Sequence, residues 1–202
     1  RHTLIPRPDT ETLIEAILSR AGIDTDETCF LDIGTGSGCI LLSLLSEYPL
    51  ARGIGCDISP EALGVAQKNV DSLKLSTRVK LFELDILCGK SEQILMQEGP
   101  YDCVLSNPPY IPDEDIGGLM QDVKDYEPLS ALKGGGDGLM FYREISRQAA
   151  VLWKKNGLLA FEVGVDQADD VQIIMADIGF ESIEIQNDLA GIPRVVSGYF
   201  VK

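Results

Sequence analysis

The residues best suited to chemistry are Asn107, Pro108, Pro109 and Tyr110, which follow the apolar run 101–105. A strand cannot continue through two prolines, because each lacks an N–H and fixes φ at about −65°. The chain must therefore leave the sheet at Asn107 in a rigid turn. That turn presents an amide side chain, carbonyl oxygens and an aromatic ring, and such groups can hold a planar NH₂ group from two directions.

An amide or exocyclic amino nitrogen is a poor nucleophile, because its lone pair is delocalised. A general base helps little, since the N–H becomes acidic only as the new bond forms. Orientation helps more: the Asn107 side-chain oxygen and the Pro108 carbonyl can accept the two N–H bonds, while Tyr110 packs on the planar group. Asn-Pro-Pro-Tyr resembles the signature of methyltransferases that act on planar nitrogens of adenine, cytosine or glutamine. A purely structural proline turn is the plain alternative.

A second group of residues, Gly34-Thr35-Gly36-Ser37-Gly38, follows the apolar run 28–33 and opens an apolar helix. Glycines let the backbone turn tightly and approach a ligand closely. The third glycine of the dinucleotide fingerprint G-x-G-x-x-G would come one position later than it does here. Asp32 stands just before the loop and completes the pattern D-x-G-x-G-x-G. A strand-to-helix turn that binds nothing is the alternative.

Acidic residues end the next two predicted strands. Asp57 is placed to accept both ribose hydroxyls of an adenosine, and Asp85-Ile86 offers polar and apolar contact to an adenine. Local capping is the plainer interpretation of both acids. Together with the glycine loop, they resemble the S-adenosylmethionine (SAM) site of the Rossmann-like methyltransferases. The resemblance implies that SAM is bound by Gly34, Thr35, Gly36, Ser37, Gly38, Asp57, Asp85, Ile86 and Asn107.

Helical and strand-like segments alternate along most of the chain. Strands are predicted at 28–33, 52–56, 78–84, 101–106, 158–163, 180–186 and 194–201. Helices are predicted from Asp9-Thr10 to Gly22, from Gly38 to before Pro49, and at 59–70, 91–97, 139–152 and 167–178, with a turn at 156–157 and an irregular stretch at 112–136. This order predicts an α/β fold with a seven-stranded, mostly parallel sheet, helices on both faces and a C-terminal antiparallel hairpin. Asp32, Asp57, Asp85 and Asn107 then share the edge at the carboxyl ends of the strands, where ligands bind.

Composition narrows the function further. The 202 residues fit one domain, and the formal net charge of −15 argues against a nucleic acid as the main partner. The five cysteines show no metal-binding spacing and are expected to be free thiols in a reducing compartment. His2 is the only histidine, which argues against a Ser-His-Asp triad or a histidine metal site, and no metal is predicted. No apolar run reaches the roughly 20 residues of a membrane span.

The resemblance extends along the whole chain to the HemK/PrmC family, the peptide chain release factor glutamine methyltransferases. Its more specific motifs are Leu-Ile-Pro-Arg-Pro-Asp-Thr-Glu at 4–11, Tyr-Glu-Pro-Leu at 126–129 and Gly-Gly at 134–135. The other matching segments are 32–38, 57–60, 106–110, 131–132, 137–139, 188–191 and 194–196. Membership implies N5-methylation of the glutamine in the Gly-Gly-Gln tip of class-1 release factors, with SAM as donor and Asn107, Pro108, Pro109 and Tyr110 as the catalytic turn.

Two departures and two alternatives accompany this interpretation. The family carries a helical N-terminal domain, whereas this chain opens on Arg1 and is expected to be a single catalytic domain over 1–202. The position after Asp85 is often aromatic in the family and is Ile86 here.

An adenine-N6 nucleic-acid methyltransferase shares the Asn107 turn, and a non-catalytic SAM-binding partner of translation termination shares the glycine loop. We expect a cytoplasmic protein, or an organellar one, with no nucleic-acid or membrane partner.

Overall fold

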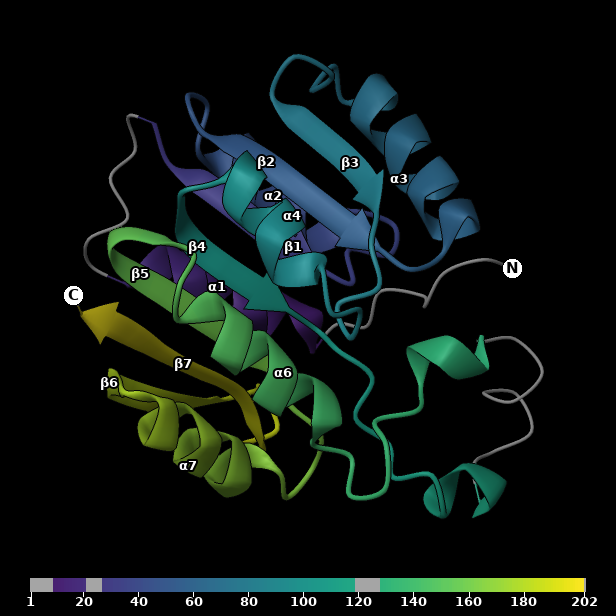
Figure 1. The fold of residues 1–202 in the computed structure, drawn as a ribbon, viewed down its shortest axis with the longest axis vertical. Coiled ribbons are helices and arrows are strands. Elements are labelled where there is room, and N and C mark those ends of the chain that lie inside the picture. The colour runs from purple at the N-terminus through teal and green to yellow at the C-terminus, as the bar shows by residue number, and fades with distance from the viewer. Residues whose placement is uncertain (1–8, 21–26, 119–127, 202) are drawn as a thin grey trace.

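The computed structural model describes residues 9–20, 27–118 and 128–201, and one seven-stranded sheet runs through it (Figure 1). The strands are β1 (Cys29–Ile33), β2 (Arg52–Asp57), β3 (Val79–Glu83), β4 (Tyr101–Ser106), β5 (Trp153–Glu162), β6 (Phe180–Asn187) and β7 (Pro193–Val201). Their order in the sheet is β3-β2-β1-β4-β5-β7-β6. Strands β1 to β5 are parallel, and β7 lies antiparallel between β5 and β6. The predicted fold is confirmed.

This order places a crevice at the middle of the sheet. From β1 the chain first moves outward to β2 and β3, then crosses back to β4 on the other side of β1. The loops after β1 and β4 therefore leave the sheet in opposite directions, and ligands of open α/β sheets bind where this happens. Gly34 directly follows β1 and Asn107 directly follows β4.

Helices cover both faces of the sheet, as Figure 1 shows. They are α1 (Thr10–Ser19), α2 (Cys39–Glu47), α3 (Pro60–Ser72), α4 (Ser91–Glu98), α6 (Met140–Ala149) and α7 (Ala168–Ile178). Residues of α1, α2 and α3 enter one apolar cluster, and residues of α4, α6 and α7 enter the other. Because both faces are packed, β1 is buried along its whole length. That burial explains why four of its five residues are apolar, and Asp32 is the single polar residue in the strand.

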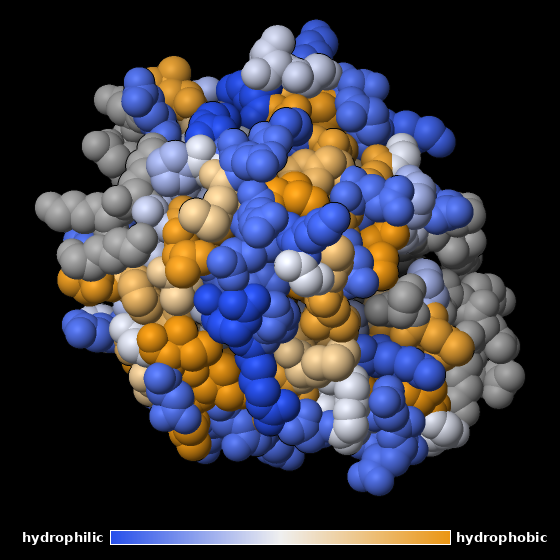
Figure 2. Space-filling view, in the orientation of Figure 1, coloured by the Kyte–Doolittle hydropathy of each residue, from blue (hydrophilic) through white to orange (hydrophobic). Residues whose placement is uncertain are grey.

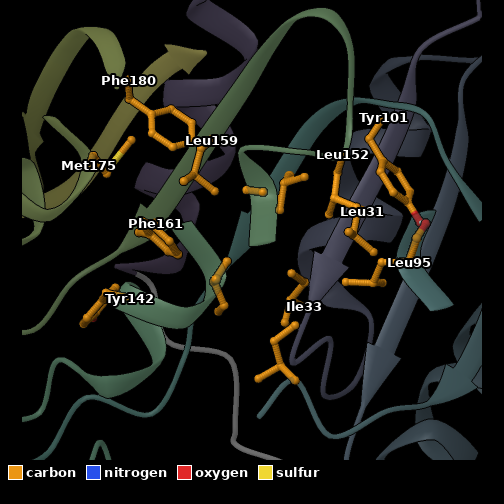
Figure 3. Packing of buried hydrophobic residues seen from close by; sticks show 14 of the residues in the cluster. Leu31, Ile33, Leu95, Tyr101, Tyr142, Leu152, Leu159, Phe161, Met175 and Phe180 are labelled. Carbon is orange, nitrogen blue, oxygen red and sulfur yellow. The ribbon is translucent and has the colours of Figure 1, made fainter. Parts of the chain in front are cut away.

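Two buried tyrosines, Tyr101 and Tyr142, lie among the apolar side chains of the core (Figure 3), and the hydroxyl of each makes a hydrogen bond. The Tyr101 hydroxyl donates to the Leu95 carbonyl at 2.9 Å, and the Tyr142 hydroxyl donates to the Glu162 carbonyl at 3.1 Å. Tyr142 also meets Phe161 edge to face, with 5.2 Å between ring centroids. Each large apolar side chain buried here contributes roughly 1.5–3 kcal/mol. The Tyr142 bond fixes α6 against the carboxyl end of β5, beside the crevice.

The predicted turn at 156–157 is wrong, and so is the predicted start of the fifth strand. Strand β5 begins at Trp153, and Asn156 and Gly157 pair with β7 instead of reversing the chain. The pairing of β5 with β4 is irregular just before them, which makes this segment a bulge. A Cβ at Gly157 would lie 1.8 Å from the Trp153 ring, so only glycine fits. The Asn-Gly pair therefore marks a bulge under an indole ring.

Helix ends agree with the predictions in part. The Ser59 hydroxyl caps α3 by accepting from the Ala62 N–H at 3.2 Å, with proline next in the chain. Asp9 precedes α1, but its side chain makes no capping bond. Helix α1 ends at Ser19, and the predicted end at Gly22 lies outside the described residues. Helix α6 stops at Ala149 rather than at the predicted residue 152, because tight three-residue turns lead the chain into β5.

The stretch 112–136 is irregular where it is described, as predicted. It holds two short 3-10 turns, η1 (Asp115–Gly118) and η2 (Leu129–Ala131). Segment 119–127, with Tyr126 and Glu127 of the predicted motif, lies outside the described residues, as does motif segment 4–8. After η2 the chain pairs with the turn that follows β4, through a bridge between Ile111 and Lys133. This pairing brings the second half of the stretch to the crevice.

The surface carries mixed side chains. On the face that Figure 2 shows, hydrophilic residues separate the apolar ones into small patches. All five cysteines are free thiols, as expected. Within 9–20, 27–118 and 128–201, no helix has the length and apolar character that crossing a membrane requires.

Candidate functional site

A cavity of about 310 Å³ opens at the carboxyl ends of β1 to β4. Its lining includes the predicted site residues Gly34, Asp57, Asp85, Ile86, Asn107, Pro108 and Pro109. The structure thus brings the glycine loop, the two strand-end acids and the proline turn to one hollow. Thr35, Gly36, Ser37, Gly38 and Tyr110 were also predicted to bind or act, and they are not among the described residues that line it.

The glycine loop is held from outside the cavity. Gly34, Gly36 and Gly38 all have positive φ, between +57° and +79°, which side-chain-bearing residues rarely adopt. The N–H groups of Gly34 and Thr35 both donate to the Cys56 carbonyl at the end of β2. A Cβ on Gly34 would meet nothing within 4 Å, so the backbone at this point faces open space. A ligand can therefore lie directly against the loop.

Asp57 connects the glycine loop to helix α3. One carboxylate oxygen accepts from the Gly36 N–H at 2.8 Å, and the other accepts from the Ser59 N–H at 2.9 Å. Each oxygen of a carboxylate has two acceptor positions, so one position on each remains for a ligand. The sequence predicted a ligand-binding role for Asp57, with local capping as the alternative, and the structure adds that of a brace for the loop.

Asp32 is fully buried beneath the loop. One of its carboxylate oxygens accepts from the Thr35 hydroxyl at 2.7 Å, and the other, Oδ1, has no hydrogen-bond partner among the described residues. Burial raises the pKa of Asp32 to about 7, the Thr35 hydrogen bond opposes the shift, and the charge of Asp57 adds to it. The Thr35 hydroxyl therefore fixes the orientation of the Asp32 carboxyl group. This task explains why Thr35 lies behind the cavity wall and not in the lining.

The wall beside Asp85 is apolar. Ile86 lines the cavity after Asp85, and Phe141 and Ile145 reach it from α6. The Asp85 carboxylate accepts from the Leu87 N–H at 2.9 Å, which forms a local turn and leaves acceptor positions for a ligand. The sequence reasoning missed Phe141 and Ile145, because apolar residues at helical spacing are usually core residues. They supply apolar surface at the side of the cavity where Ile86 stands in place of an aromatic residue.

The proline turn is anchored at its start. The Ser106 hydroxyl donates to the Ile33 carbonyl at 2.6 Å, which ties the end of β4 to the end of β1. Asn107 is half-buried at the cavity and Pro108 is buried. Tyr110 is half-buried and packs against the apolar cluster on the α6 and α7 face. The turn thus presents Asn107 to the cavity while Tyr110 is held against the protein.

These residues suit SAM. Carboxylates at Asp57 and Asp85 are acceptors for the hydroxyl and amino groups of a nucleoside, and the walls at Ile86 and Phe141 are apolar. The open face of Gly34 admits a ligand without a steric clash. The acceptor turn lies in the same lining, so a donor bound there has the reactive groups of Asn107 and Pro108 beside it.

Comparisons with known proteins agree with this geometry. A family profile described as "Methyltransferase domain" matches residues 30–126. The release factor glutamine methyltransferase of Clostridium acetobutylicum is 44% identical over 194 residues, which cover 96% of this chain and 66% of that protein. The protein of the same name from Agrobacterium fabrum is 38% identical, with coverage of 98% and 67%. The chain spans 56% of the relative from Rhodospirillum rubrum, so it matches only part of such proteins.

Solved structures show the same fold. The hMettl16 catalytic domain, solved with MAT2A 3′UTR hairpin 6, has a TM-score of 0.71 at 16% identity and coverage of 100% of this chain and 74% of that one. That likeness concerns the fold alone. The protein-(glutamine-N5) methyltransferase (release factor-specific) of Alicyclobacillus acidocaldarius has a TM-score of 0.57 at 26% identity, with coverage of 98% and 95%. On the identity and coverage of these relatives, the chain belongs to the release factor glutamine methyltransferase family.

Proposed function

We propose that residues 1–202 form a catalytic domain that transfers a methyl group from SAM to the side-chain amide of the glutamine in the Gly-Gly-Gln motif of class-1 release factors. The observation that carries the proposal is the shared cavity: Asn107 and Pro108 line it together with Gly34, Asp57 and Asp85. SAM is the cofactor that the family and this lining both indicate. The proposed substrate implies a cytoplasmic enzyme.

Each part of the lining has a separate task in the proposed reaction. Gly34 offers bare backbone to the donor, Asp57 accepts from its ribose hydroxyls, and Asp85 and Ile86 contact its adenine. When bound, SAM supplies a methyl group on a positively charged sulfur atom. The Asn107 side-chain oxygen and the Pro108 carbonyl accept the two amide N–H bonds of the glutamine and aim its nitrogen lone pair at that methyl.

The turn needs no strong base for this task. The amide proton becomes acidic only as the methyl group arrives, and by then the nitrogen carries positive charge. An acceptor on each N–H stabilises that developing charge, and neutral oxygens are sufficient. As the nitrogen forms its bond to the methyl carbon, the bond from that carbon to sulfur breaks, S-adenosylhomocysteine leaves as a neutral thioether, and one N–H proton passes to solvent. Oriented hydrogen bonds of this kind are worth about 10²- to 10³-fold in rate when one is removed. The rate therefore depends on how accurately Asn107 and Pro108 are placed.

Charge favours a protein substrate over a nucleic acid. The chain carries a net charge of −15, and Asp113, Glu114 and Asp115 are exposed just after the catalytic turn. Exposed acidic groups that follow the catalytic turn in sequence repel phosphates and attract a basic protein surface. This disfavours the adenine-N6 alternative, although its turn has the same sequence.

The test is methyl transfer to a purified class-1 release factor, followed by mass spectrometry of the peptide that contains Gly-Gly-Gln. We expect wild type to add one methyl group to the glutamine. Asn107→Ala should bind SAM within about threefold of wild type and lose about 10²- to 10³-fold in turnover. Glu181→Gln, an exposed change on the edge strand β6, is the matched control and should keep wild-type turnover.

Two results would overturn the proposal. Wild type that binds SAM but leaves a saturating release factor unmethylated would exclude the activity and favour the non-catalytic alternative. Undiminished turnover in Asn107→Ala would show that the turn is structural.

A further inference from the structure

The far end of the catalytic turn is held by Gln167, a residue outside the cavity lining. Its side-chain Nε2 donates to the Tyr110 carbonyl at 2.9 Å, and its Oε1 accepts from the Gly164 N–H at 3.1 Å. Gln167 stands directly before α7, and Gly164 lies two residues after Glu162, the last residue of β5. One amide side chain therefore links the catalytic turn, the end of β5 and the start of α7.

Both partners fix the orientation of this amide. The Tyr110 carbonyl can only accept, so it requires the NH₂ end, and the Gly164 N–H can only donate, so it requires the oxygen. Rotating the amide by half a turn would place donor against donor and acceptor against acceptor. The bridge thus needs a donor at one end of the side chain and an acceptor at the other. Glutamate has the same shape, but it is ionised at neutral pH and offers no donor, so it does not reproduce the bridge.

Glycines leave no free space around the bridge. A Cβ on Gly138, whose φ is +76°, would lie 2.4 Å from the Tyr110 oxygen and 2.6 Å from Nε2 of Gln167. A Cβ on Gly134 would lie 2.8 Å from backbone atoms of Tyr110. A Cβ on Gly164 would lie 2.6 Å from Oε1 of Gln167. Three close backbone approaches therefore confine Tyr110 and the Gln167 amide together.

The sequence of the turn explains why such an anchor matters. Pro108 and Pro109 have no N–H to donate, so the backbone of the turn offers fewer hydrogen bonds than an ordinary turn does. Its near end is tied through Ser106 to Ile33, and its far end through Tyr110 to Gln167. Asn107 and the Pro108 carbonyl lie between these two ties.

We infer that Gln167 is a positioning residue, which holds the catalytic turn in its reactive geometry by fixing the Tyr110 carbonyl. The inference rests on the proposed function and adds a residue to it. Because Gln167 acts through Tyr110, its loss should lower turnover and leave the SAM half of the cavity unchanged. A displacement of about 1 Å at a reacting group can lower a rate about 10²-fold.

The decisive variant is Gln167→Glu, studied as a function of pH. The ionised carboxylate still accepts from Gly164 but meets the Tyr110 carbonyl acceptor to acceptor. The protonated form regains a donor and matches the amide at both ends. We expect turnover at pH 8 to be at least about tenfold below wild type, and the ratio to wild type to recover as pH falls to about 5.

Neighbouring charges act on the introduced carboxyl group. Asp166, Asp169 and Asp170 stand beside it in sequence, and Glu162 ends β5. From the α6 side come Asp137 and Arg143, which pair with each other, and Tyr110 is the phenol in the turn. From β7 comes Arg194, which donates to the Val163 carbonyl and pairs with Asp188. The acids outnumber the two arginines, so they favour the protonated form and move the recovery toward neutral pH.

Controls separate positioning from folding. Gln167→Met keeps the side-chain length without either hydrogen bond, and should lose turnover at every pH. Asp169→Asn, an exposed change in the first turn of α7, should match wild type. Amide exchange measured by NMR gives a readout other than activity: the Gly164 N–H should exchange faster in Gln167→Met and stay protected in Gln167→Glu.

The outcomes distinguish the two proposals. Suppose that wild type methylates the release factor. The positioning role is then wrong if the turnover of Gln167→Glu equals that of wild type at pH 8. It is also wrong if the turnover of Gln167→Glu stays low at every pH while the Gly164 N–H remains protected. Weakened binding of S-adenosylhomocysteine in Gln167→Met, by more than about threefold, would also overturn it, because the effect would then reach the donor half. If wild type itself transfers no methyl group, the failure belongs to the proposed function.

Discussion

Replacing Asp57 tests the donor half of the site most directly, because its carboxylate has two tasks. It accepts backbone hydrogen bonds from Gly36 at 2.8 Å and Ser59 at 2.9 Å, and it lines the cavity. In Asp57→Ala the Gly36 N–H loses its acceptor, and so, in the proposed binding mode, do the ribose hydroxyls of the donor. Asp57→Asn keeps the size of the side chain, but its NH₂ group cannot accept, so half of the acceptor capacity is lost.

The expected loss of ligand affinity in these variants follows from the strength of a hydrogen bond to a charged group. Hydrogen bonds to a charged group contribute about 1.5–3 kcal/mol, which corresponds to roughly 10- to 150-fold in Kd. We expect Asp57→Ala to weaken binding of SAM and S-adenosylhomocysteine toward the upper part of that range, since loop and ligand both lose a partner. The loss of affinity in Asp57→Asn should lie toward the lower part of that range.

The assay is titration calorimetry with S-adenosylhomocysteine and with its analogue that lacks the ribose 2′-hydroxyl. If Asp57 binds that hydroxyl, the analogue binds wild type more weakly, and the difference between the two ligands disappears in Asp57→Ala. Ser59→Ala is the matched control: it removes the helix cap on Ala62 and keeps the backbone N–H that Asp57 accepts. It should lower the free energy of unfolding by about 1 kcal/mol and leave Kd unchanged.

Two results would refute this reasoning about Asp57. Binding of S-adenosylhomocysteine by Asp57→Ala within twofold of wild type would remove Asp57 from the site. A penalty for the missing hydroxyl that persists undiminished in Asp57→Ala would leave only the loop-bracing role.

Two further predictions concern stability. The folded-state pKa of Asp32 is raised from 3.8 to about 7, so the folded state binds more protons than the unfolded state between these values and stability falls as pH rises. We therefore expect the free energy of unfolding of Asp32→Asn, measured with urea relative to wild type, to rise by about 2–3 kcal/mol between pH 5 and pH 8. A difference that does not change with pH would contradict the burial argument. The Arg78 guanidinium donates to the carbonyls of Tyr48, Ala51 and Leu45 at the end of α2. Arg78→Met should lower the free energy of unfolding by about 2–4 kcal/mol, whereas the exposed control Arg52→Met should change it by less than about 0.5.

Much of the fold could be predicted because its signals are local. Apolar runs that end in glycine, proline or an acid identify β1 to β4, and the residues just after those strands necessarily share one edge. Asp57, Asp85 and Asn107 were found in this way. The start of β5 could not be found, because Asn156-Gly157 gives a turn signal whose meaning depends on the indole ring of Trp153 above it.

The missed parts of the site depend on contacts between distant segments. Phe141 and Ile145 reach the cavity only because α6 packs over the ends of the central strands, and in sequence they look like any core residues of a helix. The second task of Asp57 depends on the pairing of β1 with β2, which brings Gly36 to its carboxylate. Gln167 gave no sequence signal, since a polar residue before a helix is ordinary.

The positions of these residues separate donor binding from acceptor placement along the chain. The general methyltransferase profile matches 30–126, which contains the glycine loop, both strand-end acids and the catalytic turn. The residues that confine the far end of the turn, Gly134, Gly138, Gly164 and Gln167, all come later. The accuracy with which Asn107 meets an amide therefore depends on residues that come later in the chain than the catalytic turn itself. Phe141 and Ile145 are also late in the chain but line the cavity, so the separation applies to the four confining residues and not to the whole second half. Changes at those four residues should alter turnover while donor affinity stays constant, which is the pattern that the Gln167 variants measure.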